Sequence, residues 1–254
     1  MYFKIIKAMR KVIFYILSGL LICNLLLTSC VDCIDGNDRI VEQTRVFDNL
    51  FFDEVISNGN FDVEIIQDNS YDIVVKADDN VLPYINTYVQ GNKLYIENKN
   101  NKCYSTNNRP VIFIYSPTLS FVKMNGSGNI HCNRWIDNTL ELDLELSGSG
   151  NIVFEGLLLK TLFANVSGSG IIELYGTTKT GDLSISGSGK IKAFSLDQDD
   201  SYATISGSGN IYTFFYNLLD VEITGSGNVF YKGDSRYVSW KITGSGSVIN
   251  NNKK

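Results

Sequence analysis

Seven copies of the triplet Gly-Ser-Gly constrain the fold of this 254-residue chain more than any other feature of the sequence. Successive copies begin 18 to 22 residues apart, so a structural unit of about twenty residues recurs along the chain. The sequence therefore predicts a repeat architecture. The fourteen glycines of the triplets are Gly126, Gly128, Gly148, Gly150, Gly168, Gly170, Gly187, Gly189, Gly207, Gly209, Gly225, Gly227, Gly244 and Gly246.

The residues on either side of each triplet alternate between apolar and polar side chains. Two and four positions before the first glycine every copy has an apolar residue, as in Val122 and Met124, with a polar residue such as Lys123 between them. Two positions after the triplet every copy has Ile or Val. A period of two is typical of a β-strand with one buried face, so we expect one strand before and one strand after each triplet.

The glycines are expected to form a corner between these two strands. In the middle of a strand each glycine costs roughly 0.5–1 kcal/mol relative to alanine, whereas a turn with positive φ or a close backbone contact requires glycine. Stacked corners would place the middle serines in a column with about 4.8 Å between neighbours. Four copies continue with an asparagine that can form a side-chain amide ladder, and these are Asn129, Asn151, Asn210 and Asn228.

These patterns predict an all-β fold, a right-handed parallel β-helix (β-solenoid) with coils of about 20 residues marked by Gly-Ser-Gly corners. An antiparallel sheet of seven hairpins is the alternative, but Gly-Ser-Gly is a poor hairpin signal beside Asn-Gly. Residues 44–118 are expected to continue the same body less regularly. Within them, Asn58-Gly59-Asn60 resembles a degenerate corner. Strands are expected over residues 61–67, 73–77, 94–97 and 111–115.

The N-terminal segment has the composition of an export signal. Four basic residues precede an apolar run from Val12 to Leu27, and the run ends in Leu27-Thr28-Ser29-Cys30, which resembles a bacterial lipobox. We therefore expect a lipoprotein signal peptide over residues 1–29 and lipidation of Cys30. An ordinary signal peptide and an uncleaved anchor remain open as alternatives. The expected order is then a tether over 30–44, one β-helix domain over 45–250 and a polar tail over 251–254.

Removal of the signal changes the charge of the chain from −5 to −9, because the signal carries four basic side chains and no acidic one. Nucleic-acid binding requires clustered Lys and Arg, so an acidic mature protein is a poor candidate for it. The expected location is the outer membrane of the cell envelope, on its periplasmic or its surface side. The lipid would provide the contact with the membrane.

Cysteine and histidine are too scarce for most site chemistries. Cys132 falls on an inward-facing position and is expected to be a buried apolar side chain, whereas Cys33 and Cys103 lie in polar sequence and their pairing stays open. His131 is the only histidine and falls on an outward-facing position, so a metal or catalytic role is not expected. No cofactor and no metal site are predicted.

The chain resembles the putative auto-transporter adhesin family with a head GIN domain, also known as a domain of unknown function. The residues that carry the likeness are those from Phe51 to Ile65, the segment Val75-Lys76-Ala77-Asp78-Asp79-Asn80, and the repeated Ser-Gly-Ser-Gly-Asn-Ile. The resemblance covers roughly residues 45–250. It implies a secreted or lipid-anchored β-helical protein of the bacterial envelope, with no catalytic residues to transfer. Asn is replaced by Ile171, Lys190 and Ser247 in three copies, which argues against a continuous amide ladder.

Three functions follow as hypotheses. The first is a non-enzymatic envelope protein, an adhesin or binding scaffold that presents one face of the β-helix to a glycan or a surface protein. The second is a polysaccharide-active lyase or hydrolase with exposed carboxylates, for which Asp197, Asp199 and Asp200 are the candidates; they are expected in a solvated connection instead. The third is a purely structural envelope protein.

Homo-oligomerisation is a further possibility, because the ends of an uncapped β-helix expose strand edges. Tyr212, Phe214 and Tyr216 are exposed aromatics that fit a sugar platform or an oligomer interface equally well.

Overall fold

The computed structural model describes residues 33–47, 51–135 and 141–252. The chain divides into two compact units, Met1–Cys33 and Ile34–Lys254, and every strand discussed below belongs to the second. The expected signal peptide and lipidation site Cys30 lie outside the described residues. In the part of the chain that the structure covers, no helix has the length and apolar character needed to cross a membrane.

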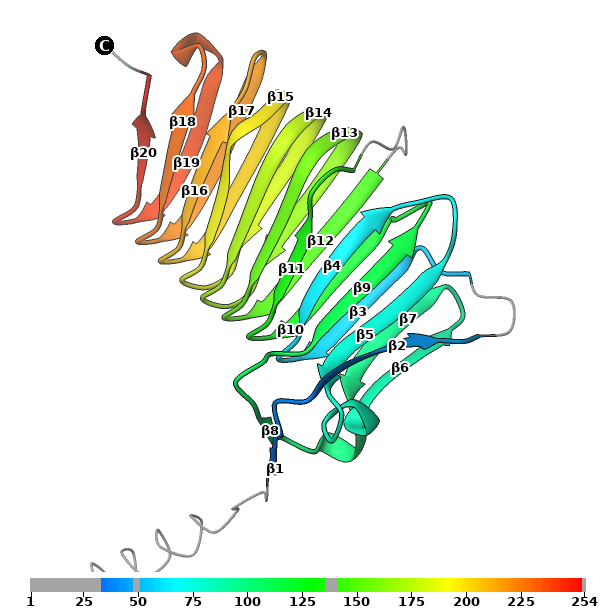
Figure 1. The fold of residues 1–254 in the computed structure, drawn as a ribbon. Helices are drawn as coiled ribbons and strands as arrows, with labels where there is room; N and C mark the ends of the chain where they lie inside the picture. The colour runs from blue at the N-terminus through cyan, green and yellow to red at the C-terminus, as the bar shows by residue number, and fades with distance from the viewer. Residues whose placement is uncertain (1–32, 48–50, 136–140, 253–254) are drawn as a thin grey trace, which may run out of the picture. The chain divides into compact units, whose positions relative to one another are not determined.

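The second unit is a stack of coils whose strands form two columns (Figure 1). The first column holds the strands that lead into the corners, and the second column holds those that leave them. The first column contains β7 (Lys93–Asn98), β3 (Glu54–Gly59), β10 (Phe121–Gly126), β12 (Glu141–Gly148), the C-terminal halves of β13 (Asn151–Val166), β14 (Ile171–Ile185) and β15 (Lys190–Gly207), β17 (Leu218–Gly225) and β19 (Val238–Gly244). The second contains β9 (Val111–Ser116), β4 (Asp62–Gln67), β11 (Asn129–Cys132), the N-terminal halves of β13, β14 and β15, β16 (Asn210–Phe214), β18 (Asn228–Lys232) and β20 (Ser247–Asn250).

All neighbours within each of these two columns run parallel, which confirms the β-solenoid and rules out the sheet of hairpins. The register is set by the corners, since Gly126 pairs with Gly148 and Gly225 pairs with Gly244. Gly126 also pairs with Gly59, so Asn58-Gly59-Asn60 is the first corner of the stack, as the sequence indicated.

The corners stack so closely that a side chain has no room there. The carbonyl oxygen of Gly148 accepts hydrogen bonds from Ser169 N (2.9 Å) and Gly170 N (3.0 Å) of the next corner. A Cβ atom on Gly168 would lie 2.2 Å from that same oxygen. Glycine is therefore required here by the approach of two backbones, and Gly148 has in addition a φ of +151°.

The inward-facing side chains of the two columns fill the space between them. The positions before and after the corners that the sequence marked as apolar are buried from β10 to β18, with exposures of at most 2% for residues such as Met124, Ile152, Leu183 and Ile223. Cys132 lies in this core with no exposed surface and as a free thiol, which confirms its expected role as a small apolar side chain.

The N-terminal third belongs to the same unit but adds antiparallel strands to it. The four predicted strands correspond to β4, β5 (Asp72–Asp78), β7 and β9. The chain order is not the stacking order, because β7 and β9 lie on the side of β3 and β4 that faces away from β10 and β11. Beyond them, β6 (Ile85–Gln90) pairs antiparallel with β7, β5 with β9, and β2 (Ile40–Arg45) with β5.

The tether expected over residues 30–44 is partly wrong. β1 (Ile34–Asp35) pairs with β8 (Tyr104–Ser105), and β2 pairs with β5 over its whole length, so residues 34–45 contribute strands to the β unit. Alternating side chains in Ile40–Arg45 show no strong apolar pattern, which is why the sequence did not predict a strand there. The remaining short elements are the 3₁₀ turns η1 (Leu82–Tyr84), η2 (Lys99–Asn101) and η3 (Ser235–Tyr237).

Candidate binding site

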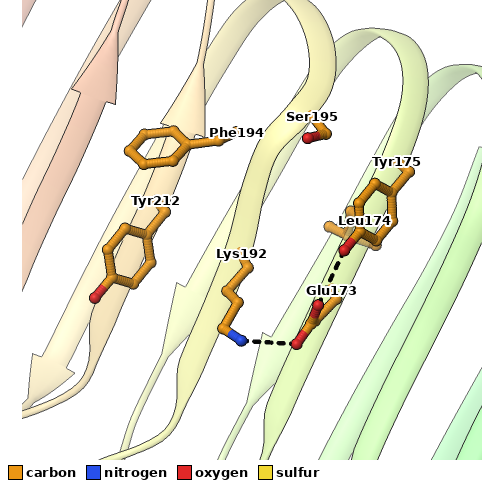
Figure 2. A pocket seen from close by; sticks show the side chains of 7 residues that line it. All are labelled: Glu173, Leu174, Tyr175, Lys192, Phe194, Ser195 and Tyr212. Carbon is orange, nitrogen blue, oxygen red and sulfur yellow. Dashed lines mark hydrogen bonds and ion pairs between the residues drawn. The ribbon is translucent and has the colours of Figure 1, made fainter. Parts of the chain in front are cut away.

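A hollow of about 320 Å³ lies on the outer face of the second column, where β14, β15 and β16 run side by side (Figure 2). We refer to it as the aromatic hollow. Its polar and aromatic side chains come from three successive coils, so the stacking of the repeat assembles the site. The residues that line it are Glu173, Leu174, Tyr175, Lys192, Phe194, Ser195 and Tyr212.

The period of two explains why these side chains point outward. Ile172, Ile191 and Ile211 follow the corners on the inward side and are fully buried, so the residue after each of them faces solvent. These next residues are Glu173, Lys192 and Tyr212, and they are paired in register across the three strands. Each is the fifth residue after the first glycine of its triplet.

The aromatic rings form a connected cluster at one side of the hollow. The rings of Phe194 and Tyr212 meet edge to face, with centroids 5.5 Å apart and an interplanar angle of 77°. The ring of Tyr212 stacks on that of Phe230 from β18, at 4.9 Å and 8°. The ammonium group of Lys232 lies 4.5 Å from the centroid of the Phe194 ring. A planar ligand therefore meets ring edges and faces next to a positive charge.

The opposite side of the hollow carries an ion pair. Lys192 Nζ donates to Glu173 Oε1 at 2.7 Å, and the Tyr175 hydroxyl donates to Glu173 Oε2 at 3.1 Å. The hydrogen bond from Lys192 lowers the pKa of Glu173, and that from Tyr175 adds to the effect. The same contact with Glu173 raises the pKa of Tyr175. Near neutral pH the hollow thus presents a carboxylate, an ammonium and a phenol within one network (Figure 2).

The sequence singled out only one residue of this site. Tyr212 lines the hollow, whereas Phe214 and Tyr216 form their own edge-to-face pair with centroids 4.8 Å apart. Glu173, Lys192 and Phe230 are missed by sequence reasoning that examines one strand at a time. Aligning all coils on their triplets would have placed them in one column with Tyr212.

The three aspartates considered for catalysis do not lie in a connection. Asp197, Asp199 and Asp200 are part of β15, and Asp197 and Asp200 pair with Thr177 and Thr180 of β14. The expectation of a loop is wrong because β13, β14 and β15 continue without a break from one column to the next. In the described part of the chain, no Lys or Arg forms an ion pair with any of the three.

The single histidine lies on the outer face of β11, between two carboxylates of neighbouring coils. His131 Nδ1 is 3.0 Å from Glu64 Oε2, and His131 Nε2 is 3.8 Å from Glu155 Oε1. Its outward position agrees with the strand parity of the sequence. The sequence left the pairing of Cys33 and Cys103 open, and in the structure both are disulfide-bonded.

The asparagine ladder forms in two separate pieces. Asn151 donates to Asn129 at 2.9 Å, and Asn129 donates to Asp62 at 2.8 Å, which extends the first piece to the corner of β3 and β4. Asn228 donates to Asn210 at 3.2 Å in the second piece. Ile171 and Lys190 occupy the column between them, as the sequence indicated.

Comparison with known proteins gives relatives of the same fold. A putative adhesin from Bacteroides fragilis has a TM-score of 0.78 at 25% identity, over 85% of this chain and 99% of that one. A putative lipid binding protein from Parabacteroides distasonis has a TM-score of 0.72 at 28% identity, over 86% and 99%. A putative adhesin from the same species has a TM-score of 0.65 at 26% identity, over 86% and 100%. No curated protein matches the chain.

The model of one protein family matches residues 51–235, which include the corners from Gly59 to Gly227 and all strands that line the aromatic hollow. The matched region is more than half of the chain. The chain therefore belongs to the family of the putative auto-transporter adhesin, head GIN domain.

Proposed function

We propose that this protein is a non-enzymatic adhesin that binds a glycan through the aromatic hollow while an N-terminal lipid on Cys30 anchors it to the outer membrane. The proposal rests on one observation: a single exposed face holds both the rings of Phe194, Tyr212 and Phe230 and the ion pair between Glu173 and Lys192. Sugar rings present C–H groups to aromatic faces and hydroxyl groups to charged side chains. The hollow offers both kinds of partner within three coils.

The electrostatics of the hollow favour binding over catalysis. Glycoside hydrolysis ordinarily uses two carboxyl groups, one of them protonated and with a raised pKa. Among the described residues Glu173 is the one carboxylate that lines the hollow, and Lys192 lowers its pKa, so that it remains an anion near neutral pH. This supports a role for Glu173 as a hydrogen-bond acceptor rather than as a general acid.

The membership in an adhesin family and the resemblance of residues 12–30 to a lipoprotein signal support the envelope location. The Parabacteroides distasonis relative is named as a lipid binding protein, so lipids belong among the ligands to be tested. In this chain the interior between the two columns is filled by buried side chains. A lipid would thus have to bind on the outer surface.

The proposal is tested by screening the full chain against immobilised neutral and acidic glycans, with phospholipid vesicles and uronic-acid polymers as parallel arms. Tyr212→Ala removes one ring of the cluster and should weaken glycan binding about 5- to 30-fold, the effect of roughly 1–2 kcal/mol. Tyr202→Ala is the matched control, because Tyr202 is 38% exposed on the first column, away from the hollow.

Three results would contradict the proposal: equal binding by both variants, binding to vesicles alone, or release of unsaturated or reducing ends from the polymers. The anchor is tested separately by metabolic labelling with a fatty-acid analogue. The full chain should incorporate the label, and Cys30→Ser should not.

A further inference from the structure

The C-terminal coil differs from the others because its core-facing side chains are open to solvent. Trp240 occupies the position at which Ala203 and Val221 of the preceding coils are each 1% exposed, yet Trp240 itself is 59% exposed. Ile242 and Val248, which also face the core, are only partly buried. Among the described residues β19 and β20 are the last strands of the stack, and nothing there covers the apolar surface that each earlier coil hides.

The backbone of this coil is also unpaired on one side. β19 pairs with β17 and β20 pairs with β18, and in the described part of the chain neither has a second neighbour. Proteins usually protect such edges with proline, several charges or a bulge. β19 and β20 contain no proline, and Lys241 is their one charged residue, already bound to Glu222 at 2.7 Å. Both strands thus offer free N–H and C=O groups beside an apolar surface.

The opposite end of the stack is closed. There β6 covers the edge of β7, and β5 and β2 extend the second column beyond β9. The core-facing residues at this end, Val75, Leu94 and Ile96, have no exposed surface. Val81 and Ile85 cover the core from the side of η1, with exposures of 0% and 3%. A head-to-tail stack of copies would require these covering strands to separate from the N-terminal end. Among the described residues, the C-terminal end is therefore the one that can pair with a partner without such a rearrangement.

The open end presents two strand edges at a separation that the corner Gly244–Gly246 fixes, with core-facing side chains between them. A single added strand would pair with one edge and leave the other open. A second coil end with the same cross-section pairs with both edges at once. We propose that the C-terminal coils of two copies of this chain join end to end, with β19 and β20 of each copy completing the stack of the other.

A two-fold axis relates the two copies, because each contributes the same surface. This axis lies across the stack, so the new strand pairs are antiparallel, although all pairs from β10 to β20 within one copy are parallel. The assembly closes at two copies, since each copy has one open end. The two Trp240 side chains become buried at the junction.

The test uses the full chain, expressed in a Gram-negative host and purified in detergent, with its mass measured by light scattering over a range of concentrations. The wild type should show a monomer–dimer equilibrium. Trp240→Lys and Val248→Lys change one residue on each edge strand, and each should weaken the dimer at least tenfold. Tyr202→Lys is the matched control on an interior coil and should leave the dimer unchanged.

Fluorescence provides a second readout on the same samples, because Trp135 and Trp240 are the two tryptophans of the chain and Trp135 is fully buried. Dilution of the wild type should shift the emission to longer wavelength, as Trp240 becomes exposed, and Val248→Lys should show the shifted emission at all concentrations. A cooperative unfolding transition in the variants, compared with the wild type at a concentration where the wild type is also a monomer, would show that they remain folded. The inference is wrong if the wild type is a monomer throughout, if the two edge variants dimerise like the control, or if the mass grows without limit.

Discussion

Gly168→Ala tests whether close stacking of backbones is the reason for the repeated glycines. The new Cβ would lie 2.2 Å from the carbonyl oxygen of Gly148, whereas ordinary contacts begin at 3.4 Å. The corner must therefore move by about 1.2 Å. This displaces the oxygen from Ser169 N and Gly170 N, which now lie at 2.9 and 3.0 Å. Two hydrogen bonds of about 1 kcal/mol each, together with steric strain of about 1–3 kcal/mol, predict a destabilisation of about 3–5 kcal/mol.

The assay is thermal unfolding of the full chain followed by circular dichroism, with hydrogen exchange to locate the weakened coil. For a domain of this size the expected loss corresponds to a decrease in Tm of about 6–20 °C. Gly91→Ala is the matched control. Gly91 has a φ of +67° in the turn between β6 and β7, but its Cβ would meet no atom within 4 Å, so the cost is about 1 kcal/mol from backbone conformation alone. Equal effects of the two variants, or a smaller effect of Gly168→Ala, would refute the stacking argument.

Three further predictions concern titratable groups. Burial raises the pKa of Asp182, so the folded state binds the proton of this carboxyl more tightly than the unfolded state, and its ionisation opposes folding. Asp182→Asn should therefore raise Tm at pH 7. This difference should disappear at a pH below the pKa values of Asp182 in the folded and unfolded states. Burial raises the pKa of the Cys132 thiol to about 12. The folded protein should therefore lose stability above about pH 9, where the thiol ionises in the unfolded state. Cys132→Ala should remove this part of the alkaline loss when thermal unfolding is measured over a series of pH values. The hydrogen bond to Glu173 raises the pKa of Tyr175, and Glu173→Gln should lower it again in an NMR titration of labelled tyrosine.

Most of the regular stack was predictable from the sequence, because two independent signals coincide there. The glycine triplets fix the register between coils, and the period of two fixes which side chains face inward. Met124, Ile152 and Ile223 are buried as this reasoning requires. The same logic found the corner at Gly59, where Asn60 and Phe61 replace the serine and the second glycine of the triplet.

The N-terminal strands and the binding site were harder to predict, for different reasons. β7 lies next to β3 although 33 residues separate Gly59, the last residue of β3, from Lys93, the first residue of β7, and pairing at this distance leaves no local pattern. In the aromatic hollow, the register shift between Glu173 and Tyr175 moves Ser195 opposite Tyr175, so parity alone misplaces the side chains around it. The continuous strand β15 likewise carries Asp197 and Asp200 across the bend that composition marked as a loop.

Attachment of bacteria to glycan-coated surfaces tests the central proposal, that the aromatic hollow makes this protein an adhesin. A strain deleted for the protein would be complemented with the wild type, with Phe194→Ala/Tyr212→Ala, or with Tyr202→Ala at equal surface amounts. The double variant should attach like the deletion strain, because it lacks the edge-to-face pair at 5.5 Å, whereas Tyr202→Ala should attach like the wild type. Attachment by the double variant at the level of the wild type would contradict the proposal that the aromatic hollow binds glycans.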